Sequence, residues 1–367
     1  MTLIRPSLVV STLALYVVLP AAGAGAKSPG AVGAYVAFRS AHAGTPGQVK
    51  ALVNEAADAG IQFLLPCAKS TSGSAFYDSK IMPTVYRDFD PLRILIETAR
   101  QRGLGVYPWI CANVDGGRKP SPFLEAHPDW CMVNSRGERA GWFDPSCAEA
   151  RRYIAATVRE IAENYDIDGI SLDYVRYGSP GRFCYCDRCR TAFKEAFGLD
   201  CIGAERAAAG TDLWRKWRLW RQRQLTAELE EIRHALNSAK PGATLSAYVW
   251  GVHTYGSRYD TCQDWKTWIK RGLLDWVNPS GYVYSRDKFK ARIADNLKAV
   301  PQGFPLLVTI GVRTSHGALE TPADVEAYIR DSLALGADGV VLFTLEWTRP
   351  FLRDLTPALR DIAAAAR

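Results

Sequence analysis

Two acidic residues follow apolar segments of this 367-residue chain. Asp173 follows the apolar residues 169–172, and Glu346 follows the apolar residues 339–345. Most glycoside hydrolysis uses two carboxyl groups about 5 to 9 Å apart on either side of the scissile bond. One group protonates the leaving oxygen, and the other attacks the sugar or activates water. The two residues therefore predict cleavage of a glycosidic bond, with Asp173 as nucleophile or base and Glu346 as the acid.

The sequence leaves two points about this pair open. It does not fix the distance between the two carboxyl groups, so retaining and inverting mechanisms both stay open. Asp173 could also form a purely structural ion pair with Arg39 or Arg176.

Aromatic and polar residues near the expected strand ends are candidates for binding a sugar, because aromatic faces can stack on pyranose rings. Two acidic residues in loops belong with them. Asp78 follows the second expected strand, and Asp144 precedes the helix expected at residue 148. Asp144 has an alternative role as a cap or turn carboxylate for that helix. The predicted substrate-binding residues are Arg39, Asp78, Trp109, Asp144, Tyr174, Arg176, Trp250, Tyr282 and Trp347.

Three of the nine cysteines form a C-x-C-x-x-C motif at Cys184, Cys186 and Cys189. This spacing suits a tetrahedral structural zinc, with Cys201 or an outside residue as the fourth ligand. In an exported chain the same thiols could instead form disulfides with distant partners. In either case we expect the cluster to stiffen the loop after Asp173. If the three thiols bind metal, the remaining cysteines could pair as Cys67 with Cys111, Cys131 with Cys147, and Cys201 with Cys262.

Several other chemistries lack their sequence motifs. The chain has no HxH or HExxH spacing and no G-x-S-x-G segment, so we expect no metal or other cofactor for catalysis and no serine nucleophile. Its formal net charge of +7 is spread along the chain, which does not indicate a nucleic-acid partner. Residues 310–313 and 344–347 contain no glycine-rich phosphate loop, and Glu346 would repel an anion. A phosphorylated substrate is therefore disfavoured.

The elements that must position these residues alternate between apolar runs and helical patterns. Eight such pairs predict an α/β fold, a single (β/α)8 TIM barrel, in which strands four and eight place Asp173 and Glu346 on opposite sides of the mouth. Helix-ending glycines such as Gly60 and Gly336 support this reading. The expected strands are residues 31–38, 62–65, 105–110, 169–172, 244–249, 276–279, 305–310 and 339–345, and the expected helices include residues 46–59, 91–102, 148–164, 212–239 and 322–335.

The first 26 residues have the pattern of a secretory signal peptide. Arg5 supplies the positive start, residues 8–19 the apolar run, and residues 24–26 an A-x-A cleavage site before Lys27. No later stretch is long and apolar enough to cross a bilayer. We therefore expect residues 27–367 to form one exported domain, periplasmic or extracellular, with a cysteine-rich loop at residues 178–201.

Several segments together carry a family resemblance: residues 76–80, 127–130, 142–145, 168–177, 263–265, 274–279 and 336–343. In these segments the chain resembles the bacterial family 10 glycosylhydrolase-like proteins. The resemblance implies a (β/α)8 barrel acting on polysaccharide, with the aspartate of the D-Y-V-R-Y motif, here Asp173, as nucleophile in the active site. Where the family often has Pro-Met-Asn-Tyr after strand six, this chain reads N-P-S-G-Y, so only Tyr282 carries over.

These observations predict an exported glycoside hydrolase acting on a polysaccharide or oligosaccharide. Two alternatives use the same fold. A non-catalytic carbohydrate-binding barrel would bind glycan in the same groove without releasing reducing ends. A structural protein of the cell envelope would need a large exposed apolar patch.

Overall fold

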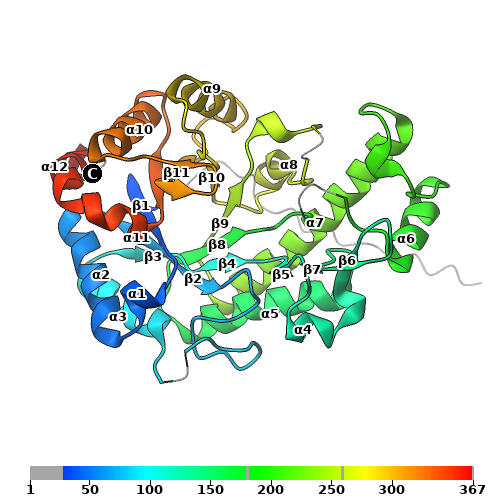
Figure 1. The fold of residues 1–367 in the computed structure, drawn as a ribbon, viewed down its shortest axis with the longest axis horizontal. Coiled ribbons are helices and arrows are strands. Elements are labelled where there is room, and N and C mark those ends of the chain that lie inside the picture. Colours follow the sequence, from blue (N-terminus) through cyan, green and yellow to red (C-terminus); the bar gives the residue numbers. More distant parts are fainter. Residues whose placement is uncertain (1–27, 87, 179–181, 258–259, 366–367) are drawn as a thin grey trace, which may run out of the picture.

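The computed structural model describes residues 28–86, 88–178, 182–257 and 260–365, so the predicted signal peptide lies outside the described residues. Eight parallel strands form a ring with helices on its outside (Figure 1). The strands are β1 (Val32–Val36), β2 (Phe63–Lys69), β4 (Trp109–Cys111), β8 (Gly169–Asp173), β9 (Thr244–Val249), β10 (Trp276–Pro279), β11 (Leu307–Gly311) and β14 (Gly339–Phe343).

The strands pair in the order β10-β9-β8-β4-β2-β1-β14-β11. Two isolated parallel bridges, Val277 with Leu306 and Ser280 with Thr309, connect β10 to β11 at the remaining junction. Every residue of β1, β2 and β8 is buried, as expected for parallel strands covered on both faces. The predicted (β/α)8 barrel is confirmed.

The helices begin and end at signals that the sequence carries. Thr45 and Asp90 each accept a backbone N–H of the first helical turn, and a proline follows each of them. Gly60 ends its helix with a left-handed φ of 96°, a conformation that favours glycine. The long outer helices are α2 (Pro46–Ala59), α3 (Pro91–Gln101), α5 (Ala148–Asn164), α7 (Asp212–Ala239), α9 (Arg286–Leu297), α10 (Pro322–Ala334) and α12 (Leu352–Ala365), and α8 (Trp265–Lys270) is shorter.

Most expected strands differ from the structure by a few residues at their ends, and two of them differ in a way that changes the local fold. The strand expected at residues 105–110 divides into β3 (Gly105–Val106), which pairs with β2, and β4. The strand expected to reach Leu345 ends at Phe343, and the short helix α11 (Leu345–Thr348) begins there. Glu346 therefore lies in a helical turn rather than at a strand end.

An insertion between β4 and α5 was not predicted. It contains the antiparallel sheet β5 (Val114–Gly117), β7 (Arg139–Phe143) and β6 (Cys131–Val133), in that order. Helix α6 (Asp187–Phe197) follows β8 and lies beside this sheet at one end of the molecule (Figure 1). Together these elements extend the barrel next to the loop that follows Asp173.

Large aromatic rings fill the amino-terminal half of the barrel. Phe63 and Trp276 come from the opposed strands β2 and β10, yet their ring centroids are 6.3 Å apart. Tyr107 contacts both rings edge-on, with centroids 5.8 Å from each. The lumen is therefore packed at this end, and open volume lies toward the carboxyl ends of the strands. Among the described residues, no helix has both the length and the hydropathy needed to cross a membrane.

Candidate active site

A cavity of ≈ 1010 Å³ lies at the carboxyl ends of the barrel strands, where the loops of such barrels carry chemistry. Its walls combine aromatic rings, arginines and hydroxyl groups. The lining residues that bear on binding or chemistry are Arg39, Thr71, Trp109, Asp173, Tyr174, Arg176, Tyr248, Trp250, His253, Ser280, Tyr282, Arg292, Arg313, His316, Phe343 and Trp347.

Asp173 is the last residue of β8 and has 9% of its surface exposed. Burial raises the pKa of its carboxyl group to about 6, against the opposing effects of the nearby Arg176 charge and the Tyr174 N–H. That N–H donates to Oδ1 of Asp173 at 2.6 Å. A carboxyl group with this pKa exchanges a proton close to neutral pH, which is the property that general acid–base catalysis requires.

The guanidinium group of Arg176 is held between aromatic rings. It lies 4.6 Å from the ring centroid of Tyr174, 4.9 Å from that of Trp142 and 5.0 Å from that of Trp250. Within the described residues no arginine or lysine is within ion-pair distance of Asp173. The structural ion pair that the sequence left open is therefore not formed, and Arg176 acts on Asp173 at longer range.

Two tyrosines complete the wall near Asp173. The rings of Tyr248 and Tyr282 lie 5.7 Å apart, and Tyr282 is also 5.4 Å from Phe343. Burial, reinforced for Tyr248 by the charge of Asp173, raises the pKa of both phenols above the usual value. Both side chains are therefore neutral hydrogen-bonding groups at physiological pH.

The structure places Glu346 away from the cavity. Its side chain is 3% exposed and is not part of the cavity wall. Oε1 accepts the backbone N–H of Ala37 at 2.8 Å, because α11 begins at Leu345 and turns the carboxylate toward the chain that follows β1. Glu346 therefore does not line the cavity with Asp173, although the charges of both carboxylates act on the thiol of Cys67.

Asp78 and Asp144 also lie off the cavity. Asp78 is exposed and pairs with Lys80 at 2.8 Å. Asp144 is fully buried, and its Oδ1 accepts the N–H of Ser146, which is the turn role that the sequence offered as an alternative. The helix cap of α5 is Cys147 rather than Asp144. The other predicted substrate-binding residues line the cavity: Arg39, Trp109, Tyr174, Arg176, Trp250, Tyr282 and Trp347.

The sequence of this chain also matches a known protein family. A family model described as glycosyl hydrolase-like 10 matches residues 34–302, most of the described chain. The chain belongs to the glycosyl hydrolase-like 10 family. The expected family resemblance is thereby confirmed.

Solved glycosidases share the fold of this glycosyl hydrolase-like 10 protein. The PgaB (BpsB) glycoside hydrolase domain from Bordetella bronchiseptica has a TM-score of 0.71 and 15% identity, with 91% of this chain and 98% of that chain covered. Alpha-L-fucosidase isoenzyme 2 from Paenibacillus thiaminolyticus has a TM-score of 0.65 and 20% identity, with 92% and 49% covered. Beta-galactosidase from Bacillus circulans sp. alkalophilus has a TM-score of 0.64 and 14% identity, with 91% and 57% covered.

A match to one curated relative covers a shorter segment of the chain. An S-layer-related protein of Niallia circulans is 26% identical over 107 residues, which cover 24% of this chain and 7% of that protein. The chain therefore spans only a small part of this relative. The similarity concerns one segment and says little about the rest of either protein.

Sequence reasoning missed some cavity residues in this glycosyl hydrolase-like 10 protein. Tyr248 had a usable signal, because it lies two positions before Trp250 and side chains alternate along a strand. Arg292 comes from α9, and His316 from the turn between β12 (Arg313–Thr314) and β13 (Gly317–Ala318). Neither stands at a barrel strand end, so no local pattern marks it.

All nine cysteines lie in the described residues, and all are free thiols in the structure. None of the three predicted disulfides is formed. Cys184, Cys186 and Cys189 do come together, but Cys201 is not part of their cluster.

Proposed function

We propose that this protein is an exported glycoside hydrolase that cleaves a polysaccharide or oligosaccharide in the cavity beside Asp173. The observation that carries the proposal is the position of this carboxyl group. It ends a central barrel strand, faces an aromatic cavity large enough for sugar units, and has a pKa raised by burial to about 6. These are properties of a proton-transferring carboxyl group in glycosidases.

Asp173 acts as the general acid in this proposal. A group with a pKa near 6 still holds its proton in weakly acidic solution, and it can pass that proton to the leaving glycosidic oxygen. The sequence had indicated a nucleophile or base, which must be ionised. Burial of Asp173 favours the protonated form and therefore the acid role.

The aromatic residues of the wall supply sugar-binding surfaces. Trp250 and Trp347 are half-buried and line the cavity, and arginine side chains lie over both rings, Arg176 over Trp250 and Arg313 over Trp347. Arg39 covers Trp347 with its guanidinium group 4.8 Å from the ring centroid. An apolar ring face can stack on a sugar ring, and a cation beside it can bind a negative group of the same sugar.

The charge of the cavity favours an anionic glycan. Four arginines line it, whereas Asp173 is the only acidic residue among the described residues of the wall. Arg313 is paired with Glu320, while Arg39 and Arg292 have no ion-pair partner among the described residues. Because Glu346 is off the cavity, the repulsion expected from it does not apply. A positive field in a concave site concentrates anionic ligands.

A single acidic residue in the wall also favours a second candidate function, a non-catalytic glycan-binding barrel. A hydrolase with this wall needs a second group that is not a protein carboxylate. A tyrosine nucleophile or a group of the substrate itself fills that role in some glycosidases. Burial and the charge of Asp173 raise the pKa of Tyr282 and keep it neutral, so it is a hydrogen-bond donor, and a group of the substrate is the better candidate for this role.

Export is part of the proposal. It is supported by the apolar segment and A-x-A site of residues 1–26, and by the segment shared with an S-layer-related protein. Mass spectrometry of the N-terminus of protein recovered outside the cytoplasm tests it, with Lys27 as the expected first residue.

Release of reducing ends from a panel of neutral and anionic polysaccharides tests the activity. We expect turnover with an anionic glycan, and a loss of at least 100-fold in Asp173→Asn. Asp78→Asn makes the same chemical change at an exposed, off-cavity carboxylate and should keep full activity. Binding of glycan by calorimetry without any release of reducing ends would support the binding barrel instead.

A further inference from the structure

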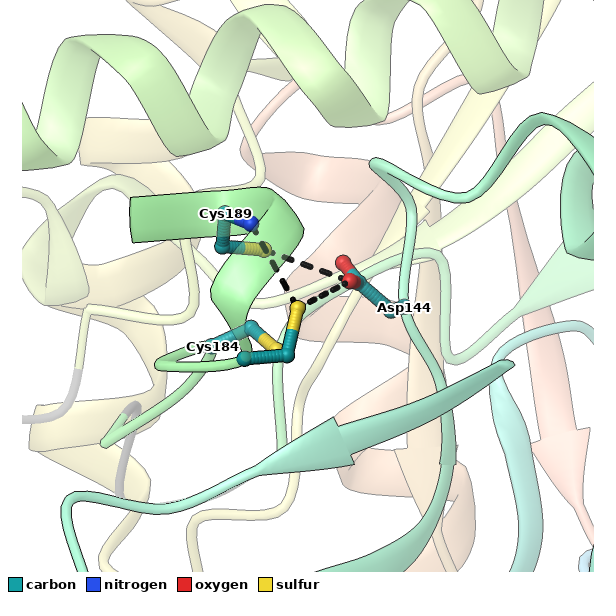
Figure 2. Close-up of side chains that lie close together, drawn as sticks. Asp144, Cys184 and Cys189 are labelled. Atoms are coloured by element: carbon teal, nitrogen blue, oxygen red, sulfur yellow. Dashed lines mark hydrogen bonds between the residues drawn. The ribbon is translucent and has the colours of Figure 1, made fainter. Parts of the chain in front are cut away.

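Four side chains outside the cavity wall meet where the inserted sheet contacts the start of α6. Asp144 follows β7, Cys184 lies in the loop after β8, and Cys189 lies in the first turn of α6 (Figure 2). Cys186 is the N-cap residue of α6. One ligand atom from each lies within 4.8 Å of the other three. We propose that these residues bind one structural zinc ion, with Asp144 as the fourth ligand from outside the cysteine motif, in place of Cys201.

The distances fit a tetrahedral zinc site. Sγ of Cys186 is 3.4 Å and Sγ of Cys189 is 3.2 Å from the same oxygen, Oδ2 of Asp144. With Zn–S of about 2.3 Å and Zn–O of about 2.1 Å, two ligands of a tetrahedron are roughly 3.6 Å apart. The donor atoms are therefore already spaced for a zinc ion between them.

Oδ2 of Asp144 has more neighbours than hydrogen bonding can satisfy. Besides the two sulfur atoms, Ser146 Oγ lies 2.7 Å away and Arg188 Nη2 lies 3.1 Å away. A carboxylate oxygen offers about two lone-pair sites, so four donors would compete for them. When Cys186 and Cys189 are thiolates bound to zinc, they no longer donate to this oxygen; zinc takes one of its sites, and Ser146 and Arg188 share the other.

Two of the sulfur atoms have contacts that favour a thiolate. Backbone N–H groups point at two of the sulfur atoms: that of Val133 at Cys184, at 3.3 Å, and that of Cys189 at Cys186, at 3.4 Å. Cys186 is the N-cap of α6, where the helix dipole favours negative charge. Hydrogen bonds of this kind orient metal ligands and stabilise the negative charge on their donor atoms.

Burial gives the ion a structural role. Cys184, Cys189 and Asp144 are fully buried, and four protein ligands leave no open position for substrate or water. Three thiolates and a carboxylate packed this closely would repel one another without a cation. A bound zinc ion would connect the loop after Asp173 and the adjoining start of α6 to the inserted sheet, which lies earlier in the chain.

Metal analysis of the full-length protein, purified without chelator, tests the proposal. We expect about one zinc per chain, and cobalt-exchanged protein should show thiolate-to-cobalt charge-transfer absorption. Cys184→Ser, Cys189→Ser and Asp144→Ala should each lower bound zinc by tenfold or more. Asp144→Cys offers a fourth thiolate and should keep it. The matched control Cys201→Ser, at a buried thiol outside the cluster, should bind zinc like the original protein.

Three results would overturn the proposal. One is purified protein with no zinc that also takes up none from added zinc chloride while its thiols are reduced. The second is a disulfide between two of the three cluster cysteines in the isolated protein, found by peptide mapping. The third is loss of zinc from Cys201→Ser but not from Asp144→Ala. The first two measurements use the original protein, so they hold even where a variant fails to fold.

Discussion

Tyr174 adopts a left-handed backbone conformation, with φ of 57°, and donates its N–H to the carboxylate of Asp173 at 2.6 Å. This conformation costs a non-glycine residue on the order of 1 kcal/mol, and such strain persists where the surrounding structure enforces it. Here the N–H of Arg176 bonds back to the carbonyl of Tyr174 and closes a tight turn. The turn fixes the direction of the carboxylate that we assign to proton transfer.

The pH dependence of turnover should report Asp173 directly. If its carboxyl group donates a proton, kcat/KM falls by about tenfold per pH unit above pH 6, because the pKa of the group is about 6. Initial rates with the best substrate of the panel between pH 4 and 9 measure this limb. A rate that instead rises through pH 6 would assign the base role to Asp173.

Asp173→Asn should stabilise the protein at neutral pH. The folded state raises the pKa of this carboxyl from the ordinary value near 3.8 to about 6, so it favours the protonated form. The stability associated with that form is fully present below about pH 4 and is lost as the pH rises through 6. Two pKa units correspond to about 3 kcal/mol at most. Urea unfolding at pH 4 and pH 7.5 should show a gain for the variant at the higher pH only.

Glu346→Gln should leave turnover within a few fold of the original, because the amide oxygen can still accept the N–H of Ala37. Glu346→Ala removes that acceptor from a buried site and should lower the free energy of unfolding by about 1 to 3 kcal/mol. Chemical unfolding and reducing-sugar release separate the two effects. If the Glu346→Gln protein folds normally but has no activity, Glu346 acts in catalysis together with Asp173.

Lys69→Met should destabilise the fold strongly. Lys69 is 1% exposed, donates to the carbonyls of Cys111 and Val114 at 2.9 and 2.8 Å, and lies 3.8 Å from Asp115. Removing the ammonium group leaves Asp115 buried without its counter-ion, which costs about 3 to 5 kcal/mol. Lys69→Met combined with Asp115→Leu should recover part of that loss in urea unfolding. Equal stability of the original protein and Lys69→Met would contradict this role.

The barrel was predictable because its signals are local. Apolar runs mark the strands, and caps such as Thr45 and Gly60 mark the helix ends within a few residues. Asp173 followed from the same reasoning, since a residue after a buried parallel strand reaches the mouth of the barrel. For this reason the expected bounds of α2, α5 and α7 match the structure.

The errors come from contacts that no local pattern encodes. Glu346 follows a strand, but helix α11 starts one residue earlier and turns its side chain to Ala37. Asp144 joins cysteines 40 or more positions away only because the inserted sheet folds against α6. The cavity residue Arg292 comes from a helix, where strand-end reasoning does not apply.

The edge-on rings of Phe63, Tyr107 and Trp276 close the barrel at its amino-terminal end, so the cavity opens on one side only. A polymer cannot pass through it end to end. In the proposed hydrolase, a long glycan would lie across the rim with one bond near Asp173, and both fragments would leave by the side they entered. Free chain ends are not needed for that geometry, so internal bonds of a polymer are as accessible as terminal ones.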